Sequence, residues 1–338
     1  MAEPAGAGNA TGAAGAPGNA AGAAGPGRKT LLILAVDHRA SLERDLYGLT
    51  APPTPAEAAR ITADKLIVYQ ALLDAAARLP ADVQPSVLID EEYGASAAEL
   101  AARSGGLIAL CMPVEASGHD WFQFAYPGDW QRHAEFFSTQ HAKVLVRDNP
   151  GLDAALRAEQ ARSLAEVSAW AERADRPLIL ELLVPAIDAD KAATGGNPDR
   201  YDDELRPGLT LRVMEYLQDR GVSPAIWKVE GLDRREDAAA VAATAQRGGR
   251  SARCIVLGRH APPAKLDRWL EVAAPLPGWI GFAIGRSIWW DALLANLHGE
   301  CTAEQARQRV TQAYLDYATD YLKARDAAPA QQPAAGHQ

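Results

Sequence analysis

Short apolar runs alternate with longer amphipathic segments between residues 29 and 325 of the chain. The apolar runs predict strands at residues 31–36, 86–89, 107–111, 142–146, 178–184, 226–230, 253–257 and 279–284. The amphipathic segments predict helices at residues 55–78, 97–103, 128–140, 153–173, 209–220, 235–246, 264–272, 288–297 and 302–324. Nearly continuous apolar strands are typical of a parallel sheet that is buried on both faces.

Eight strands that each lead to a helix are the number found in a TIM barrel. A doubly wound sheet is the alternative, but it usually has a glycine-rich fingerprint after its first strand, where this chain has Asp37-His38-Arg39. We therefore predict an α/β protein with a single (β/α)₈ barrel at residues 29–325 and an extra C-terminal helix. Residues 1–28 and 326–338 are of low complexity, and we expect disordered tails there.

The composition is that of an ordinary globular protein, with 48% hydrophobic and 23% charged residues. A net charge of −9 argues against a broad surface for nucleic acid or for an anionic membrane. No apolar run approaches the roughly 20 residues that span a bilayer. Three cysteines without a CxxC pair favour a reducing compartment, so we expect a cytoplasmic protein, which can form a homo-oligomer.

The strand at residues 226–230 carries a lysine among apolar neighbours. Alternation places Ile226, Lys228 and Glu230 on one face and the apolar pair Trp227 and Val229 on the other, so Lys228 should point into the barrel. Burial and neighbouring cations lower the pKa of a lysine and free its amine to attack a carbonyl. Lys228 is therefore a candidate Schiff-base nucleophile, and the alternative is an ion pair that fills the barrel.

A single carboxylate, Glu181, interrupts the aliphatic strand at residues 178–184. An inward Lys228 on the adjacent strand is its natural partner. A carboxylate in that position could transfer protons during imine formation and C–C cleavage, or it could be structural only.

Other polar side chains lie within or just after predicted strands, where TIM-barrel enzymes place their chemistry. Lys143 and Arg147 share a face of the fourth strand, and Asp37 and Asp90 end the first and second. The cations could hold substrate oxygens. The acids could contact substrate hydroxyls, bind a metal or cap the following helices.

Two loops repeat a Gly-Arg pair. Gly258-Arg259 follows the seventh strand and Gly285-Arg286 the eighth, and these are the loops that bind phosphate in many TIM barrels. We predict that they bind a phosphorylated small-molecule substrate. Turn glycines followed by surface arginines are the alternative.

A metal site is not predicted, because only His38 and His260 lie near strand ends and neither an HxH nor an HExxH pattern occurs. No cofactor is expected. Two other classes remain open: a metal-dependent lyase or isomerase built on Asp37, Asp90 and Glu91, and a non-catalytic sensor of a sugar phosphate.

Five stretches of the chain carry a family resemblance. They are Asp37-His38-Arg39, residues 90–94 (DEEYG), Leu180-Glu181, residues 227–230 (WKVE) and residues 281–290 (GFAIGRSIWW). They resemble the 5-dehydro-2-deoxyphosphogluconate aldolase-like family, the aldolase domain at the C-terminus of bifunctional inositol-catabolism proteins. A more distant resemblance is to class I tagatose-1,6-bisphosphate aldolases. The resemblance covers residues 31–325, and residues 281–290 are its most specific part.

The resemblance implies a class I aldolase on a TIM barrel. It assigns the Schiff base to Lys228, the acid/base to Glu181, a second active-site lysine to Lys143, a substrate contact to Asp37 and a phosphate loop to Gly285-Arg286. The implied substrate is 5-dehydro-2-deoxy-D-gluconate 6-phosphate, which is cleaved to dihydroxyacetone phosphate and malonate semialdehyde. In the bifunctional proteins a sugar kinase precedes this domain, whereas here a low-complexity segment does, which leaves the substrate open.

Overall fold

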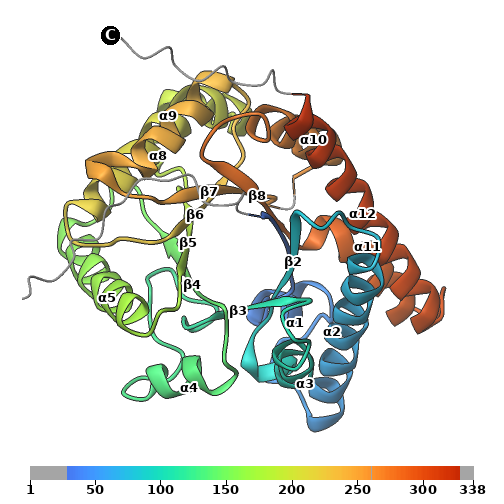
Figure 1. Cartoon of the computed structure of the whole chain (residues 1–338). Coiled ribbons are helices and arrows are strands. Elements are labelled where there is room, and N and C mark those ends of the chain that lie inside the picture. Colours follow the sequence, from blue (N-terminus) through green and yellow to red (C-terminus); the bar gives the residue numbers. More distant parts are fainter. Residues whose placement is uncertain (1–28, 260, 328–338) are drawn as a thin grey trace, which may run out of the picture.

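Eight parallel strands close into a barrel in the computed structural model, which describes residues 29–259 and 261–327. The strands follow one another around the ring in sequence order, and the helices surround them (Figure 1). This confirms the predicted (β/α)₈ barrel. The predicted tails at residues 1–28 and 328–338 lie outside the described residues.

The strands agree closely with the predicted ranges. They are β1 (Thr30–Ala35), β2 (Val83–Leu88), β3 (Ala109–Pro113), β4 (His141–Arg147), β5 (Leu178–Leu183), β6 (Ile226–Glu230), β7 (Arg253–Leu257) and β8 (Trp279–Ile284). The helices are α1 (Ala40–Asp45), α2 (Pro55–Ala76), α3 (Glu91–Ala102), α4 (Trp130–Phe136), α5 (Ala154–Arg173), α6 (Asp188–Ala193), α7 (Pro198–Arg200), α8 (Arg206–Gln218), α9 (Arg235–Ala245), α10 (Pro263–Ala273), α11 (Arg286–Leu297) and α12 (Ala303–Asp326).

Alternation along each strand divides the apolar side chains into two cores. Ile33, Ile179 and Ile226 belong to the small cluster inside the barrel. Leu180 and Trp227 belong to the larger cluster between the strands and the helices. The faces predicted for β5 and β6 are therefore the observed ones, and Lys228 points inward.

The last helix is the predicted addition to the eight-fold pattern. Thr302 and Gln305 form a reciprocal capping box at its start, which satisfies backbone N–H groups that an uncapped helix leaves free. Along its length α12 packs against α2, α10 and α11. Near its end Arg325 pairs with Asp82 at 2.9 Å, just before β2. Asp326, which we expected in the tail, is the final residue of this helix.

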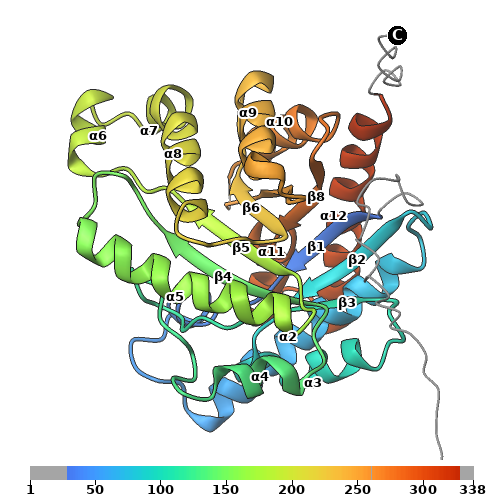
Figure 2. The same ribbon diagram turned by 60° about the vertical axis from the view of Figure 1, so that its left-hand side comes forward.

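Several segments differ from the prediction, and α1 and α6 lie where no helix was predicted. Residues 195–203, expected to be a loop, contain α7 and the beginning of a π-helical turn, η1 (Tyr201–Leu205), because Asn197 caps α7 and Pro198 begins it. With α6 they form an insertion between β5 and α8, and in Figure 2 α6 and α7 lie together beside α8. Helix α3 begins at Glu91 instead of residue 97, because the Asp90 carboxylate accepts the Tyr93 N–H and caps it.

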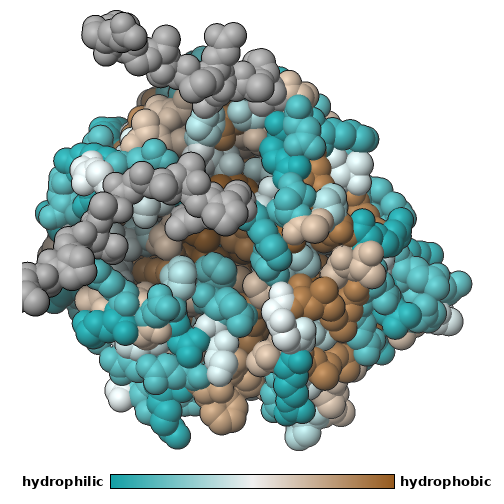
Figure 3. Space-filling view, viewed as in Figure 1, coloured by the Kyte–Doolittle hydropathy of each residue, from teal (hydrophilic) through white to brown (hydrophobic). Residues whose placement is uncertain are grey.

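On the face shown in Figure 3, hydrophilic residues occupy most of the periphery. None of the helices in the described ranges is long and apolar enough to cross a membrane.

Candidate active site

A cavity of about 460 Å³ lies at the C-terminal ends of the strands. Its walls include the inward side chains of β4 and β5, the residues that follow β1 and β8, and the segment 115–122 that follows β3. Eight of the ten predicted catalytic and substrate-binding residues line it: Asp37, Lys143, Arg147, Glu181, Lys228, Arg259, Gly285 and Arg286.

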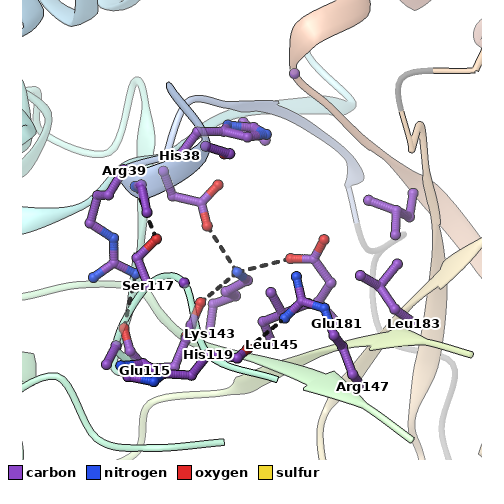
Figure 4. Close-up of a pocket in the computed structure, with 18 of the residues that line it drawn as sticks. His38, Arg39, Glu115, Ser117, His119, Lys143, Leu145, Arg147, Glu181 and Leu183 are labelled. Carbon is purple, nitrogen blue, oxygen red and sulfur yellow. Dashed lines mark hydrogen bonds and ion pairs between the residues drawn. The ribbon is translucent and has the colours of Figure 1, made fainter. Parts of the chain in front are cut away.

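The Lys143 ammonium lies at the centre of a group of carboxylates. Its Nζ is 2.8 Å from Asp37 Oδ2, 2.7 Å from Glu115 Oε1 and 2.9 Å from Glu181 Oε2. Figure 4 shows it between Glu115 and Glu181. Lys143, Glu115 and Glu181 are buried and the Asp37 side chain is 10% exposed, so the charges are poorly screened and the ammonium is held in place.

Lys228 has a simpler environment. Its Nζ is 3.0 Å from Glu181 Oε2, and no second carboxylate pairs with it among the described residues. The register places Glu181 opposite Leu145 on β4 and opposite Lys228 on β6, so this one carboxylate lies between the two lysines. Only 2% of Lys228 is exposed, and this lysine forms part of the cavity wall.

The two lysines determine the charge state of the nearby acids. Burial alone would raise the pKa of Asp37 and of Glu181, but Lys143 and Lys228 more than offset it and hold both pKa values below their usual range. Burial raises the pKa of Glu115 above its usual value, although Lys143 and Arg39 oppose it. Burial lowers the pKa of Lys143, but Asp37, Glu115 and Glu181 outweigh this and raise it well above normal. Lys143 is therefore an ammonium, and Glu181 a carboxylate.

The residues that follow β8 form a wall of the cavity that suits an anion. Gly285 has no room for a side chain, since a Cβ there would lie 2.4 Å from the carbonyl oxygen of Ala35. Gly285 also gives α11 no side-chain cap, so the first-turn N–H groups of that helix keep their affinity for an anion. Arg286 begins the helix and faces the cavity. Two buried polar atoms nearby, His38 Nδ1 and Ser287 Oγ, have no hydrogen-bond partner in the described chain.

Three predicted residues are placed differently. The Asp90 carboxylate is fully buried, pairs with Lys65 of α2 and caps α3, so it does not line the cavity. Gly258 packs near Ile284 and does not line it either. Arg259 lines the cavity, but its guanidinium is bound by Asp202 and Glu230 at 2.7 Å each, which leaves it little capacity for a phosphate.

Sequence reasoning missed Glu115 and its neighbours. Residues 114–125 form a small antiparallel hairpin, in which Ala116 donates to Gln123 and Ala125 to Val114. Arg39 donates to the Glu115 carbonyl oxygen at 2.9 Å, and this fixes the hairpin beside β1. A single carboxylate in a segment without periodicity gave no signal of its inward position.

The carboxylates that a metal-dependent enzyme would need are dispersed. Asp37 pairs with Lys143, Asp90 with Lys65, and Glu91 with His133. Within residues 29–259 and 261–327 no group of three or more histidine, cysteine, aspartate or glutamate side chains is arranged to hold a metal ion. What the arrangement provides is a lysine, an adjacent carboxylate, and the uncapped start of α11 with Arg286, all around one cavity.

Solved structures with the same architecture include aldolases. A fructose-bisphosphate aldolase from Plasmodium falciparum matches with a TM-score of 0.62 at 10% identity, over 90% of this chain and 92% of that one. A Schiff-base-forming fructose-1,6-bisphosphate aldolase matches at 0.50 and 14%, over 86% and 94%. A Corynebacterium glutamicum protein matches at 0.53 and 17%, over 85% and 86%. At these identities the likeness establishes the fold alone, a TIM barrel.

The family model that matches residues 21–325 is DUF2090, described as an uncharacterized protein conserved in bacteria. The chain belongs to this family. A comparison with the curated proteins finds no match.

Proposed function

We propose that this protein is a class I aldolase that forms a Schiff base through Lys228. The observation that carries the proposal is the contrast between the two buried lysines. Lys143 is fixed by three carboxylates, whereas Lys228 pairs with Glu181 alone among the carboxylates of the described residues, at 3.0 Å, and lines the cavity. A lysine with one carboxylate as its partner can lose a proton to it and then attack a carbonyl.

The proposed reaction begins with a proton transfer from the Lys228 ammonium to Glu181. The neutral amine attacks the substrate ketone, and the carbinolamine hydroxyl leaves as water after taking that proton from Glu181. The C–C bond then breaks, and its electron pair moves to the protonated imine to give an enamine. The proton of the substrate hydroxyl passes to Glu181, and the aldehyde is released. Protonation of the enamine carbon and hydrolysis of the imine return free Lys228.

The proposed substrate is a phosphorylated keto sugar or keto sugar acid. Gly285, Arg286 and the start of α11 would hold its phosphate, and the Lys143 ammonium would hold a substrate oxygen close to Asp37. The family resemblance favours 5-dehydro-2-deoxy-D-gluconate 6-phosphate, with dihydroxyacetone phosphate and malonate semialdehyde as products.

A panel assay tests the proposal. Purified protein is offered phosphorylated ketoses and the keto sugar acid phosphate, and aldehyde release is followed with and without EDTA. We expect cleavage of at least one compound, no loss of activity with EDTA, and inactivation when borohydride is added with the ketone product. Activity that EDTA abolishes, or that survives borohydride, would contradict a Schiff-base mechanism.

A further inference from the structure

A second cavity, of about 480 Å³, opens next to the first. It lies between the C-terminal ends of β4–β7 and the insertion that contains α6, α7 and η1. The insertion therefore adds a compartment to the barrel at the end that carries the lysines.

The walls of this second cavity are held by buried ion pairs. Asp202 of η1 pairs with Arg206 at 2.9 Å, with Arg259 at 2.7 Å and with Lys265 at 2.9 Å. Glu230 at the end of β6 binds Arg259 at 2.7 Å and accepts the Val184 N–H at 2.9 Å. Burial would raise the pKa of Asp202, but these cations hold it well below its usual range. The insertion is thus joined by ion pairs to α8, to the loop after β7 and to α10.

The two cavities share a wall. Arg147, Leu183 and Arg259 line both of them. Arg147 lies opposite Leu183 in the register of β4 and β5, and Leu145 lies opposite Glu181. The shared wall is therefore two residues, or one pleat, further along these strands than Glu181, the proposed acid/base. One pleat is roughly 7 Å along a strand, a distance that a ligand chain of a few carbons covers.

Arg147 and Lys191 are the cations of the second cavity with which its buried carboxylates do not pair. Asp202 is paired with Arg206, Arg259 and Lys265, and Glu230 with Arg259. Arg147 donates to the carbonyl oxygen of His119 at 3.1 Å, and no carboxylate in the described ranges pairs with it. Lys191 of α6 also lines this cavity, and its partner among the described residues is the exposed Asp188, at 3.1 Å. The remaining surface includes Ala186 and other apolar side chains, so the compartment suits a short carbon chain that ends in an anion.

We propose that the second cavity binds the half of the substrate that leaves as the aldehyde, and that this half carries a carboxylate or a phosphate facing Arg147 and Lys191. This inference rests on the proposed aldolase function. The ketone half would be held on the other side of the ring, at Gly285-Arg286 after β8, with Lys228 of β6 between the two ends.

The test uses the reverse reaction, with dihydroxyacetone phosphate as the ketone donor. Succinate semialdehyde and glyceraldehyde 3-phosphate serve as acidic acceptors, and butyraldehyde and glyceraldehyde as their neutral counterparts. We expect kcat/KM for the acidic acceptors to exceed that for the neutral ones at least tenfold. The better acidic acceptor shows whether the anion is a carboxylate or a phosphate, and equal use of all four would overturn the proposal.

Two alanine-to-tryptophan variants locate the acceptor. Ala186 lines the second cavity, whereas Ala189 is exposed on α6 and does not line it. Ala186→Trp should fill the compartment and lower kcat/KM for acidic acceptors at least tenfold. It should keep the borohydride-trapped adduct of dihydroxyacetone phosphate, and Ala189→Trp should match the wild type in both assays.

The outcomes separate this inference from the function on which it rests. A wild type that forms no adduct overturns the proposed function, and the inference falls with it. A wild type with an adduct, combined with an Ala186→Trp variant that condenses normally, overturns only the role of the second cavity. If Ala186→Trp loses the adduct as well, Arg147→Gln is the deciding variant. It should lower kcat/KM for acidic acceptors and leave kcat/KM for neutral acceptors unchanged. Any other pattern overturns the inference.

Discussion

Lys143 and Lys228 point into the same barrel from the two strands that flank β5, yet they have different partners. Lys143 on β4 is surrounded by Asp37, Glu115 and Glu181, whereas Lys228 on β6 shares only Glu181. Both lysines are about 2% exposed, so depth does not distinguish them. The number of carboxylates around each lysine distinguishes them, because each carboxylate stabilises the ammonium and opposes the loss of its proton.

Together the five groups carry three acids and two cations. If every acid were ionised, these five groups would carry a net negative charge in a buried site, which is costly. The Glu115 carboxylate pairs with Lys143, and burial raises its pKa although Lys143 and Arg39 oppose the rise. We therefore expect Glu115 to bind a proton more readily than Asp37 or Glu181, which would leave the group neutral.

The largest expected effect is on catalysis. Lys228→Met should lower cleavage by about 10⁴-fold or more, because it removes the attacking amine. Lys143→Met should be slower than the wild type but still form an adduct. Single-turnover kinetics on both variants measure the difference. If Lys228→Met cleaved substrate within tenfold of the wild-type rate, the two lysines would have been assigned the wrong way round.

The next effect is on the free energy of unfolding, which Lys143→Met should lower more than Lys228→Met does. Lys143→Met leaves three buried carboxylates with one remaining cation, so the free energy of unfolding should fall by about 3–5 kcal/mol. Lys228→Met removes a lysine with a single partner and should cost about 1–3 kcal/mol. Urea denaturation at pH 7 gives both values. A larger loss for Lys228→Met would show that the number of partners does not measure how firmly each lysine is held.

A third effect concerns the phosphate end of the substrate. Arg286 begins α11 after β8, and in the ring β8 lies closer to β6, which carries Lys228, than to β4. Arg286→Ala should raise KM for phosphorylated ketoses by about 10- to 100-fold, because it removes a hydrogen bond between Arg286 and the phosphate, and losing a hydrogen bond to a charged group usually has an effect of this size. KM for the unphosphorylated sugars should not change, and a matched panel measures both. An equal rise for both kinds of sugar would indicate a structural role for Arg286.

The smallest effect is on the pH dependence of stability. Burial lowers the pKa of His38 to about 4 from 6.5, and Arg286 and Lys228 add to the shift while Asp37 opposes it. The neutral imidazole is therefore favoured in the folded state. This contribution is complete above pH 6.5 and is lost as the pH falls toward 4. Between pH 7 and 4.5 the wild type should lose about 2 kcal/mol more than His38→Gln, as measured by urea denaturation at each pH. Equal losses would contradict a buried neutral His38.

The sequence was sufficient for the barrel and for the direction of Lys228. Both depend on local periodicity: a strand alternates every second residue, so Trp227 and Val229 place Lys228 inward without knowledge of the rest of the chain. Glu181 and Lys143 followed from the same argument. These three residues are adjacent in the structure because their strands are neighbours in the ring.

The remaining parts depend on contacts between distant segments. Asp90 ends a strand, as an active-site acid would, but Lys65 of α2 reaches it and the start of α3 takes its other oxygen. Glu115 has no periodic context, and only the folded hairpin shows that it contacts Lys143. The second cavity depends on an insertion whose ion pairs join residues up to 66 positions apart, such as Lys265 and Asp199.

The most direct test of the central claim is to identify which lysine forms the adduct. Wild-type protein is incubated with dihydroxyacetone phosphate, reduced with borohydride, digested and analysed by peptide mass spectrometry. We predict a single reduced adduct on the peptide that contains Lys228, with Lys143 unmodified. An adduct on Lys143, or none on Lys228 with any compound that the protein cleaves, would contradict the account.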